Sequence, residues 1–183
     1  ISEPQIGFDN FAAGYAMGEE ILRLGHTQVG VLSGITDWND RAADRTKGLL
    51  ACMAKAGHPV PDACRLETSY DLYKSADAFE LLMNAGQALT CVFCGNDVIA
   101  AAAQKRAQQM GLRVPEDISI TGFDDIAMAS ALYSELTTVH VPHQQMGELV
   151  AKGLLEAIES DQPVASRKIP HLIKRRQSLV SPR

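Results

Sequence analysis

The stretch VPEDISITGFDD (residues 114–125) decides the fold and also points to the function. A mostly apolar run over residues 118–120 stops at Gly122, and two carboxylates, Asp124 and Asp125, follow at once. In open parallel sheets, ligands bind beyond the carboxyl ends of the strands. We therefore expect Asp124 to face a small molecule and Asp125 to shape the bend. A plain turn role for Asp124 is the alternative.

Outward from this stretch, helices and strands are expected to alternate. Short strand-like runs precede segments with helical spacing of apolar residues, and each such segment ends at a glycine, the residue that best tolerates the left-handed position after a helix. This rhythm predicts an α/β fold with a Rossmann-like parallel sheet flanked by helices on both faces. The expected strands cover residues 5–9, 28–33, 64–68, 90–94 and 118–122, and the helices cover 10–24, 40–56, 72–85 and 97–110.

The order changes after Asp125. Residues 136–141 look like a strand, residues 144–159 have the apolar spacing of a helix, and residues 166–180 are expected to be extended. Pro170 within that last segment favours an edge strand or a bend, because proline cannot donate a ladder hydrogen bond.

Composition excludes several classes of protein. Of the 183 residues, 46% are hydrophobic, which is enough for a packed core. No apolar run approaches the roughly 18 residues of a membrane helix, and the start resembles no signal peptide. The first residue is not Met, so we expect a fragment. The net charge of −5 argues against a grip on a phosphate backbone, and the basic run at 173–177 is interpreted as a solvated strand edge rather than a DNA patch.

The four cysteines favour a reducing, cytoplasmic environment. The pair in CVFC (residues 91–94) has redox spacing, but that chemistry needs its first cysteine at a helix N-terminus. Because the run reads as a strand, buried structural thiols are the preferred interpretation.

Every expected strand end delivers polar or aromatic groups to one rim. Carboxylates and amides accept and donate to hydroxyls, and aromatic faces cover C–H surfaces, so the mixture suits a small polyhydroxylated ligand. Arg45 could instead bind a ligand carboxylate bidentately. Helix capping is the competing role for Asn10, Asp71 and Asn96, and Trp38 could simply pack. The rim residues are Asp9, Asn10, Trp38, Asn39, Arg41, Arg45, Ser69, Tyr70, Asp71, Gly95, Asn96, Asp97, Phe123, Asp124 and Asp125.

Catalysis and metal binding have little support in the sequence. There is no G-x-G-x-x-G turn of a dehydrogenase and no G-x-S-x-G nucleophile elbow. His140 and His143 flank a proline without further ligand types nearby. We therefore expect neither an enzyme nor a metal or other cofactor.

Five motifs resemble the effector-binding region of the lactose-repressor/galactose-repressor family of bacterial transcription regulators. They occur in family order and cover nearly the whole chain, and the opening GFDNFAAG is similar to gluconate-type repressors. The motifs are GFDNFAAGYAMGEEILRLGH (7–26), RTKGL (45–49), VFCGNDVIAAAA (92–103), GLRVPEDISITGFDD (111–125) and LTTVHVP (136–142).

The resemblance implies a periplasmic-binding-protein-like fold of type I, with a cleft between two subdomains. By position, Arg45 would clamp the ligand, and Asp124 and Asn96 would be polar contacts. Val141 departs from the pattern, because that position is commonly Gln. The other implied ligand-binding residues are Tyr70 as an aromatic wall, Phe11 and Ala12 on the opposite lip, and Trp38 and Asn39 on a loop that reaches the ligand.

The resemblance also implies a division of the chain. Residues 1–26 would end the N-terminal subdomain, 27–139 would form the C-terminal subdomain, 140–161 would return to the first, and 162–183 would close the second. The N-terminal helix-turn-helix and most of the first subdomain would be missing.

The implied function is effector sensing in a dimeric cytoplasmic repressor. A sugar, sugar acid or similar metabolite would bind between the subdomains and alter operator binding by the absent helix-turn-helix; residues 128–133 and the Ala-rich helix would contribute to a homodimer. A periplasmic sugar-binding protein of a transporter has the same fold and is the alternative function.

Overall fold

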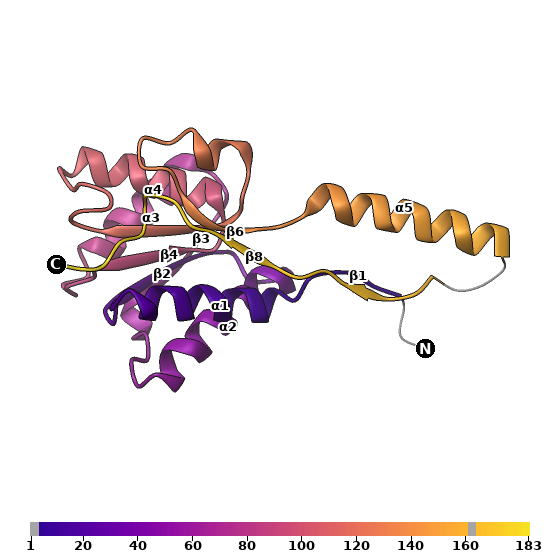
Figure 1. Cartoon of the computed structure of the whole chain (residues 1–183). Helices are drawn as coiled ribbons and strands as arrows, with labels where there is room; N and C mark the ends of the chain where they lie inside the picture. Colours follow the sequence, from indigo (N-terminus) through magenta and orange to yellow (C-terminus); the bar gives the residue numbers. More distant parts are fainter. Residues whose placement is uncertain (1–3, 161–163) are drawn as a thin grey trace.

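A computed structural model describes residues 4–160 and 164–183 of the chain. Its main body is a sheet of six strands in the order β3-β2-β4-β5-β6-β8, parallel except for the antiparallel pair β6/β8 (Figure 1). The predicted α/β fold with a mostly parallel sheet is therefore confirmed. The strands are β2 (Val29–Gly34), β3 (Arg65–Thr68), β4 (Cys91–Cys94), β5 (Ser119–Asp124), β6 (Thr137–His140) and β8 (Leu172–Lys174).

Helices cover both faces of this sheet. Helices α1 (Asn10–Arg23) and α2 (Asp40–Lys55) lie on one face, and α3 (Leu72–Met83) and α4 (Asp97–Gln109) lie on the other (Figure 1). Short 3₁₀ turns are η1 (Asp62–Cys64) and η2 (Ala127–Ser130). The glycine after each of the four helices has a positive φ, between 77° and 96°, which is the conformation predicted from the sequence.

The core lies between the sheet and these helices. β2 and β4 are buried along their whole length, as expected for central parallel strands covered on both sides. Phe79, Phe93 and Phe123 are the largest side chains that are fully buried.

All four cysteines are free and buried, and burial raises the pKa of the Cys91 and Cys94 thiols. Buried thiols with a raised pKa are expected of inert structural cysteines rather than of a redox pair.

A second part of the chain stands away from the body. Helix α5 (His143–Ser160) and the parallel pair β1 (Ile6–Gly7) and β7 (Arg167–Lys168) form this arm (Figure 1). The chain passes between arm and body near residues 8–9, 141–142 and 169–171. Among the described residues of α5 none is buried, and apolar side chains such as Leu154 and Ile158 are exposed.

Helix α1 packs with the body rather than with the arm. Ala13, Met17 and Ile21 are fully buried in the same core as the six-stranded sheet. By its packing, α1 belongs with the body, and the subdomain boundary that the resemblance put between residues 26 and 27 stays a prediction. Residues 161–163, where two of the expected ranges meet, lie outside the described residues.

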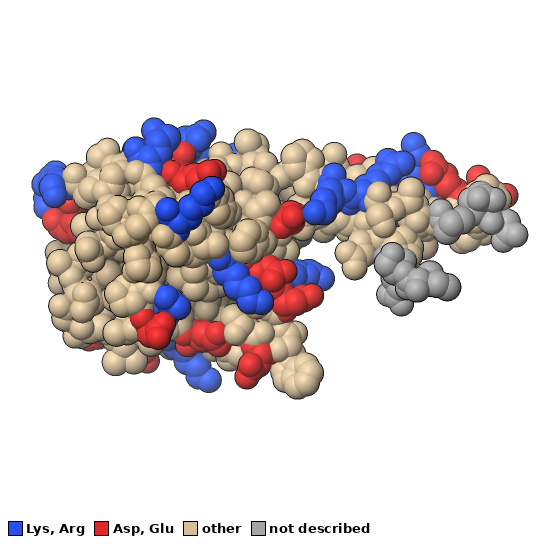
Figure 2. Space-filling view, turned by 90° about the horizontal axis from the view of Figure 1, so that it is seen from below, with Lys and Arg blue, Asp and Glu red and all other residues tan. Residues whose placement is uncertain are grey.

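The basic run at 173–177 belongs to β8 and the residues after it, at the sheet edge, as predicted. Arg175 binds Glu20 of α1 through its Nε at 2.7 Å, and Arg176 binds Asp125 at 2.6 Å. Figure 2 shows Lys and Arg side chains interspersed with Asp and Glu on the face that it presents. Arg175 and Arg176 thus both form ion pairs with carboxylates of the same chain.

Candidate ligand-binding site

The site is built on a close crossing of α1 and α2. A Cβ atom added at Gly14 would lie 1.9 Å from the carbonyl oxygen of Arg45, and one added at Gly48 would lie 2.0 Å from that of Phe11. Only glycine permits this approach of the two backbones. The crossing brings Asn10, at the start of α1, within reach of the Arg45 side chain.

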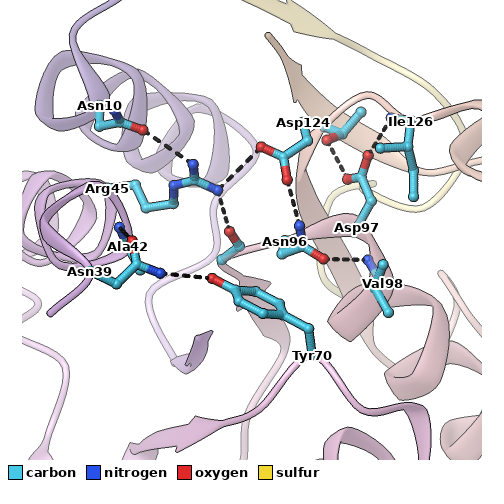
Figure 3. A network of polar contacts seen from close by, with 12 residues as sticks. Asn10, Asn39, Ala42, Arg45, Tyr70, Asn96, Asp97, Val98, Asp124 and Ile126 are labelled. Carbon is cyan, nitrogen blue, oxygen red and sulfur yellow. Dashed lines mark hydrogen bonds and ion pairs between the residues drawn. The ribbon is translucent and has the colours of Figure 1, made fainter. Parts of the chain in front are cut away.

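Arg45 is the centre of this network of polar contacts (Figure 3). Its Nη1 donates to the carbonyl oxygen of Gly95 at 2.7 Å and to Oδ1 of Asp124 at 3.3 Å, and its Nη2 donates to Oδ1 of Asn10 at 3.2 Å. The guanidinium lies 3.9 Å from the centroid of the Phe123 ring. Four contacts from three parts of the chain thus fix this buried cation without a ligand.

Asp124 ends β5 in an unusual backbone conformation. Its φ is 112° and that of Asp125 is 56°, both in the region that non-glycine residues rarely adopt. Burial raises the pKa of the Asp124 carboxyl, while the Arg45 guanidinium and the Asn96 amide act in the opposite direction. The strained turn holds the carboxylate over the sheet edge between these two partners.

Asn96 caps α4, one of its two predicted roles, and also contacts Asp124, while its predicted contact with a ligand stays a prediction. Its Oδ1 accepts from the N–H of Val98 at 2.7 Å and so caps α4, while its Nδ2 donates to Oδ2 of Asp124. Asn39 is similar, because its Oδ1 caps α2 through the N–H of Ala42 and its Nδ2 donates to the Tyr70 hydroxyl at 3.2 Å. Capping and site contact are thus combined in one side chain.

Asn10 does not cap its helix, contrary to one of the predicted roles. Asp9 caps α1 by accepting from the N–H of Ala12 at 2.9 Å, which leaves Asn10 free to bind Arg45. Asp71 does cap α3, as predicted.

The remaining predicted residues are not joined to this network. Trp38 is fully exposed, with φ at 61°, so it does not pack against the body. Phe11 is half-exposed and lies beside the Tyr15 ring, with 6.4 Å between centroids. Ala12 is half-buried on the same turn of α1 as Phe11, and Val141 is buried.

Three rim residues contact Arg45 in a way that the sequence did not predict. Asn10 was expected at the rim, with capping as the competing role, but not as a partner of Arg45. Gly95 and Phe123 were also expected at the rim, and only the fold shows that Arg45 reaches the Gly95 carbonyl and the Phe123 ring.

Asp97, which was expected at the rim, is instead a buried acid next to the site. Asp97 is 1% exposed; its carboxylate accepts from the Thr138 hydroxyl at 2.6 Å and from the N–H of Ile126 at 2.9 Å. An acid in the first turn of a helix normally suggests a solvated dipole interaction, so its burial could not be inferred from the sequence.

Asp125 has other partners than Asp124, as expected. It accepts from Nη2 of Arg176 and faces Nδ1 of His140 at 2.8 Å.

Residues 4–160 and 164–183 contain no group of three or more His, Cys, Asp or Glu side chains that could hold a metal ion. No helix in that part of the chain is long and apolar enough to cross a membrane.

Comparison with known proteins identifies relatives of this chain. The model of the periplasmic binding protein-like domain matches residues 19–179. The repressor PurR of Escherichia coli, described as an HTH-type transcriptional repressor, is 32% identical over 168 residues, which are 91% of this chain and 49% of that protein. The chain therefore spans about half the length of the curated relatives that it matches.

Solved structures agree with the sequence match. The transcription regulator GntR from Chromobacterium violaceum is 28% identical, with a TM-score of 0.88 over 96% of this chain and 65% of that one. A LacI family regulator from Enterococcus faecium with bound ribose is 25% identical, with a TM-score of 0.90 over 99% and 68%. These relatives are transcription regulators, not enzymes.

The predicted family resemblance is thus confirmed by the domain match, the relatives and the shared fold. This chain belongs to the periplasmic binding protein-like domain family, and within it to the effector-binding regions of LacI-family (lactose-repressor/galactose-repressor) transcription regulators.

Proposed function

We propose that this chain is the effector-sensing domain of a dimeric cytoplasmic repressor, and that it binds a sugar, sugar acid or similar small metabolite. Arg45, Asp124 and Asn96 would be the main polar contacts. The observation that carries this proposal is their convergence at the carboxyl ends of β4 and β5, where Arg45 is already fixed by its contacts with the protein. The Enterococcus faecium relative, described with bound ribose, supports this ligand class.

The polar groups suit hydroxyl recognition. The Asp124 carboxylate can accept from ligand hydroxyls, and Nη2 of Arg45 has a second N–H to donate besides the one bound to Asn10. Tyr70 and Trp38 are exposed beside this network and can cover the apolar face of a sugar ring. Phe11, Ala12 and Asn39 complete the proposed contact set from α1 and the start of α2.

The same geometry suggests how binding is transmitted. The carbonyl oxygen of Asp124 accepts from the N–H of Val141 at 3.3 Å. Val141 is followed by Pro142, where the chain passes into the arm. A ligand held between Asp124 and an N-terminal subdomain on the arm would favour one angle between them. A preference of a few kcal/mol would be enough to change operator occupancy by the DNA-binding heads of a homodimer.

A thermal-shift screen on the full-length protein tests this proposal. Sugars and sugar acids, including D-ribose and D-gluconate, are compared at about 100 times the dissociation constant, where binding adds about 2.7 kcal/mol. For a domain of about 150–250 residues that corresponds to a rise in Tm of about 5–10 °C, and the rise is smaller for the longer full-length protein. Asp124→Ala and Arg45→Ala should abolish the rise, and Arg41→Ala, exposed on the same helix, should keep it. Unchanged binding in both site variants would refute the assignment.

A further inference from the structure

The backbone that carries Asp124 needs support from outside its own strand. Two consecutive non-glycine residues, Asp124 and Asp125, have positive φ values of 112° and 56°. Such conformations persist only where the surroundings determine them. The next residue, Ile126, donates its N–H to Oδ2 of Asp97 at 2.9 Å.

Asp97 ties this turn to the neighbouring strand. Its Oδ1 accepts from the Thr138 hydroxyl at 2.6 Å, and Thr138 lies beside Gly122 in the β5/β6 ladder. A Cβ atom at Gly122 would lie 2.2 Å from Oδ1 of Asp97, so the carboxylate occupies the space that a side chain would otherwise fill. One carboxylate therefore joins α4, β6 and the residue that follows the acid pair.

The start of α4 thus contacts the turn in two places. Asn96 donates to the Asp124 carboxylate, and the adjacent Asp97 accepts from the backbone two residues beyond it. Asp97 itself is buried and binds the Thr138 hydroxyl, and Figure 3 shows its carboxylate directed to Ile126 rather than to Arg45. It has no place in the proposed ligand contacts.

We infer that Asp97 is a positioning residue for the effector acid: its hydrogen bond to Ile126 holds the turn that presents the Asp124 carboxylate to Arg45 and the ligand. This inference rests on the proposed function for the ligand, but the placement of Asp124 can be tested without one. The role requires an acceptor at this position, not a charge, so an amide should replace the carboxylate.

The test compares Asp97→Ala, Asp97→Asn and Thr138→Val in the full chain. The ligand-free readout is the NMR signals of the Arg45 guanidinium and the Asp124 carboxyl. Asp97→Ala should move both signals towards those of solvent-exposed groups, and Asp97→Asn should restore them, because its carbonyl oxygen still accepts from Ile126. Thr138→Val removes the other partner of Asp97 and should leave the signals near those of the wild type.

Binding of D-ribose and D-gluconate gives a second readout. For whichever probe binds the wild type, Asp97→Ala should weaken affinity about 10-fold or more, and the other two variants should stay within about twofold. The inference is overturned if Asp97→Ala leaves the signals unchanged, or if Thr138→Val moves them as much. Should neither probe bind the wild type, that result counts against the proposed function, and the ligand-free signals still decide the role of Asp97.

An unfolded Asp97→Ala variant would not end the test. Amide hydrogen exchange in the wild type then decides, with the Asn variant for comparison. The Ile126 N–H should be protected to the same degree as the amides of β5 in both proteins. Exchange of Ile126 at the rate of an open loop would overturn the inference.

Discussion

Asp124 and Asp125 follow one another in the chain, but their carboxylates contact separate groups. Asp124 faces Arg45 and Asn96 in the candidate site, whereas Asp125 binds Arg176 and His140 at the edge of the sheet. The positive φ values of both residues separate the two side chains. One acid thus belongs to the candidate site, while its neighbour forms an ion pair that ties the turn to the segment after β8.

Asp125→Ala should therefore destabilise the fold. The substitution removes a hydrogen-bonded ion pair whose side chains are only 10% and 18% exposed, which costs about 2 kcal/mol. Urea unfolding at pH 7 measures the difference. Asp44→Ala, which breaks an exposed pair of 3.8 Å with Lys47, should change stability by less than about 0.5 kcal/mol. Equal effects of the two substitutions would contradict the structural role of Asp125.

Arg45→Lys should also destabilise the protein although it keeps the charge. A lysine ammonium cannot reach the Gly95 carbonyl, Asp124 and Asn10 in the fork geometry of a guanidinium, so we expect a loss of about 1–3 kcal/mol. Chemical denaturation checks this value. The matched control is Arg41→Lys, one helical turn earlier and exposed, which should be neutral. A neutral Arg45→Lys would mean that the guanidinium contacts contribute little.

Much of the fold could be predicted because its signals are local. Glycines after the four helices and apolar runs between them depend on neighbouring residues only, and the strand ends then follow from the parallel order. The convergence of Asn96 and Asp124 was also accessible, since every parallel strand delivers its end to one edge, whereas the central place of Arg45, which lies on α2, followed from the family resemblance.

What could not be predicted depends on packing between distant segments. The contact of Asn10 with Arg45 requires the glycine crossing of α1 and α2, and the burial of Asp97 requires the space at Gly122. Trp38 is an opposite case, since packing was one of the roles expected for this aromatic residue and the chain exposes it completely. Neither long-range packing nor a loop conformation follows from residue spacing.

Stability should depend on pH through Asp97. Burial is the main cause that raises the pKa of this carboxyl from 3.8 to about 6, and the carboxylates of Asp124 and Asp125 add to it. The folded state then binds its proton more tightly than the unfolded state, so stability falls as pH rises from about 4 to 6. Above that window, the ionised Asp97 carboxylate lowers the free energy of unfolding by at most about 3 kcal/mol, the value that corresponds to a pKa of about 6 in the folded state and 3.8 in the unfolded state.

Asp97→Asn isolates this contribution. The free energy of unfolding of the variant, minus that of the wild type, should increase by about 2–3 kcal/mol between pH 4 and pH 7, because only the wild type ionises here. Denaturant titrations of both proteins at intervals of one pH unit measure this difference. A difference independent of pH would show that Asp97 titrates normally in the folded chain.

Glu20 should give the opposite dependence. Hydrogen bonds from Arg175 and Arg23 lower the pKa of its carboxyl to about 2, from an ordinary 4.5. Its stabilisation is therefore present above about pH 4.5 and is lost as pH falls towards 2. Glu20→Gln should cost about 1 kcal/mol at pH 7, a modest value because both arginines are largely exposed, and close to nothing near pH 2. Glu19→Gln, at the adjacent exposed position, is the control and should cost less than about 0.5 kcal/mol at pH 7.

The glycine crossing of α1 and α2 offers a test of how packing sets the site. Gly14→Ala would place a methyl group 1.9 Å from the Arg45 carbonyl oxygen, and because that atom belongs to a helix backbone, the helices must move apart. We expect a loss of about 2 kcal/mol or more in thermal or urea unfolding, together with weaker binding of any effector, since Asn10 would move away from Arg45.

Gly147→Ala is the matched control for that change. Nothing lies within 4 Å of a Cβ at Gly147, which is exposed on α5, so alanine should be neutral or stabilise the helix by up to about 1 kcal/mol. Both variants introduce the same methyl group into a helix, and they differ only in what that group meets. If Gly14→Ala were as well tolerated as Gly147→Ala, the close approach of α1 to α2 could not be what holds Asn10 against Arg45.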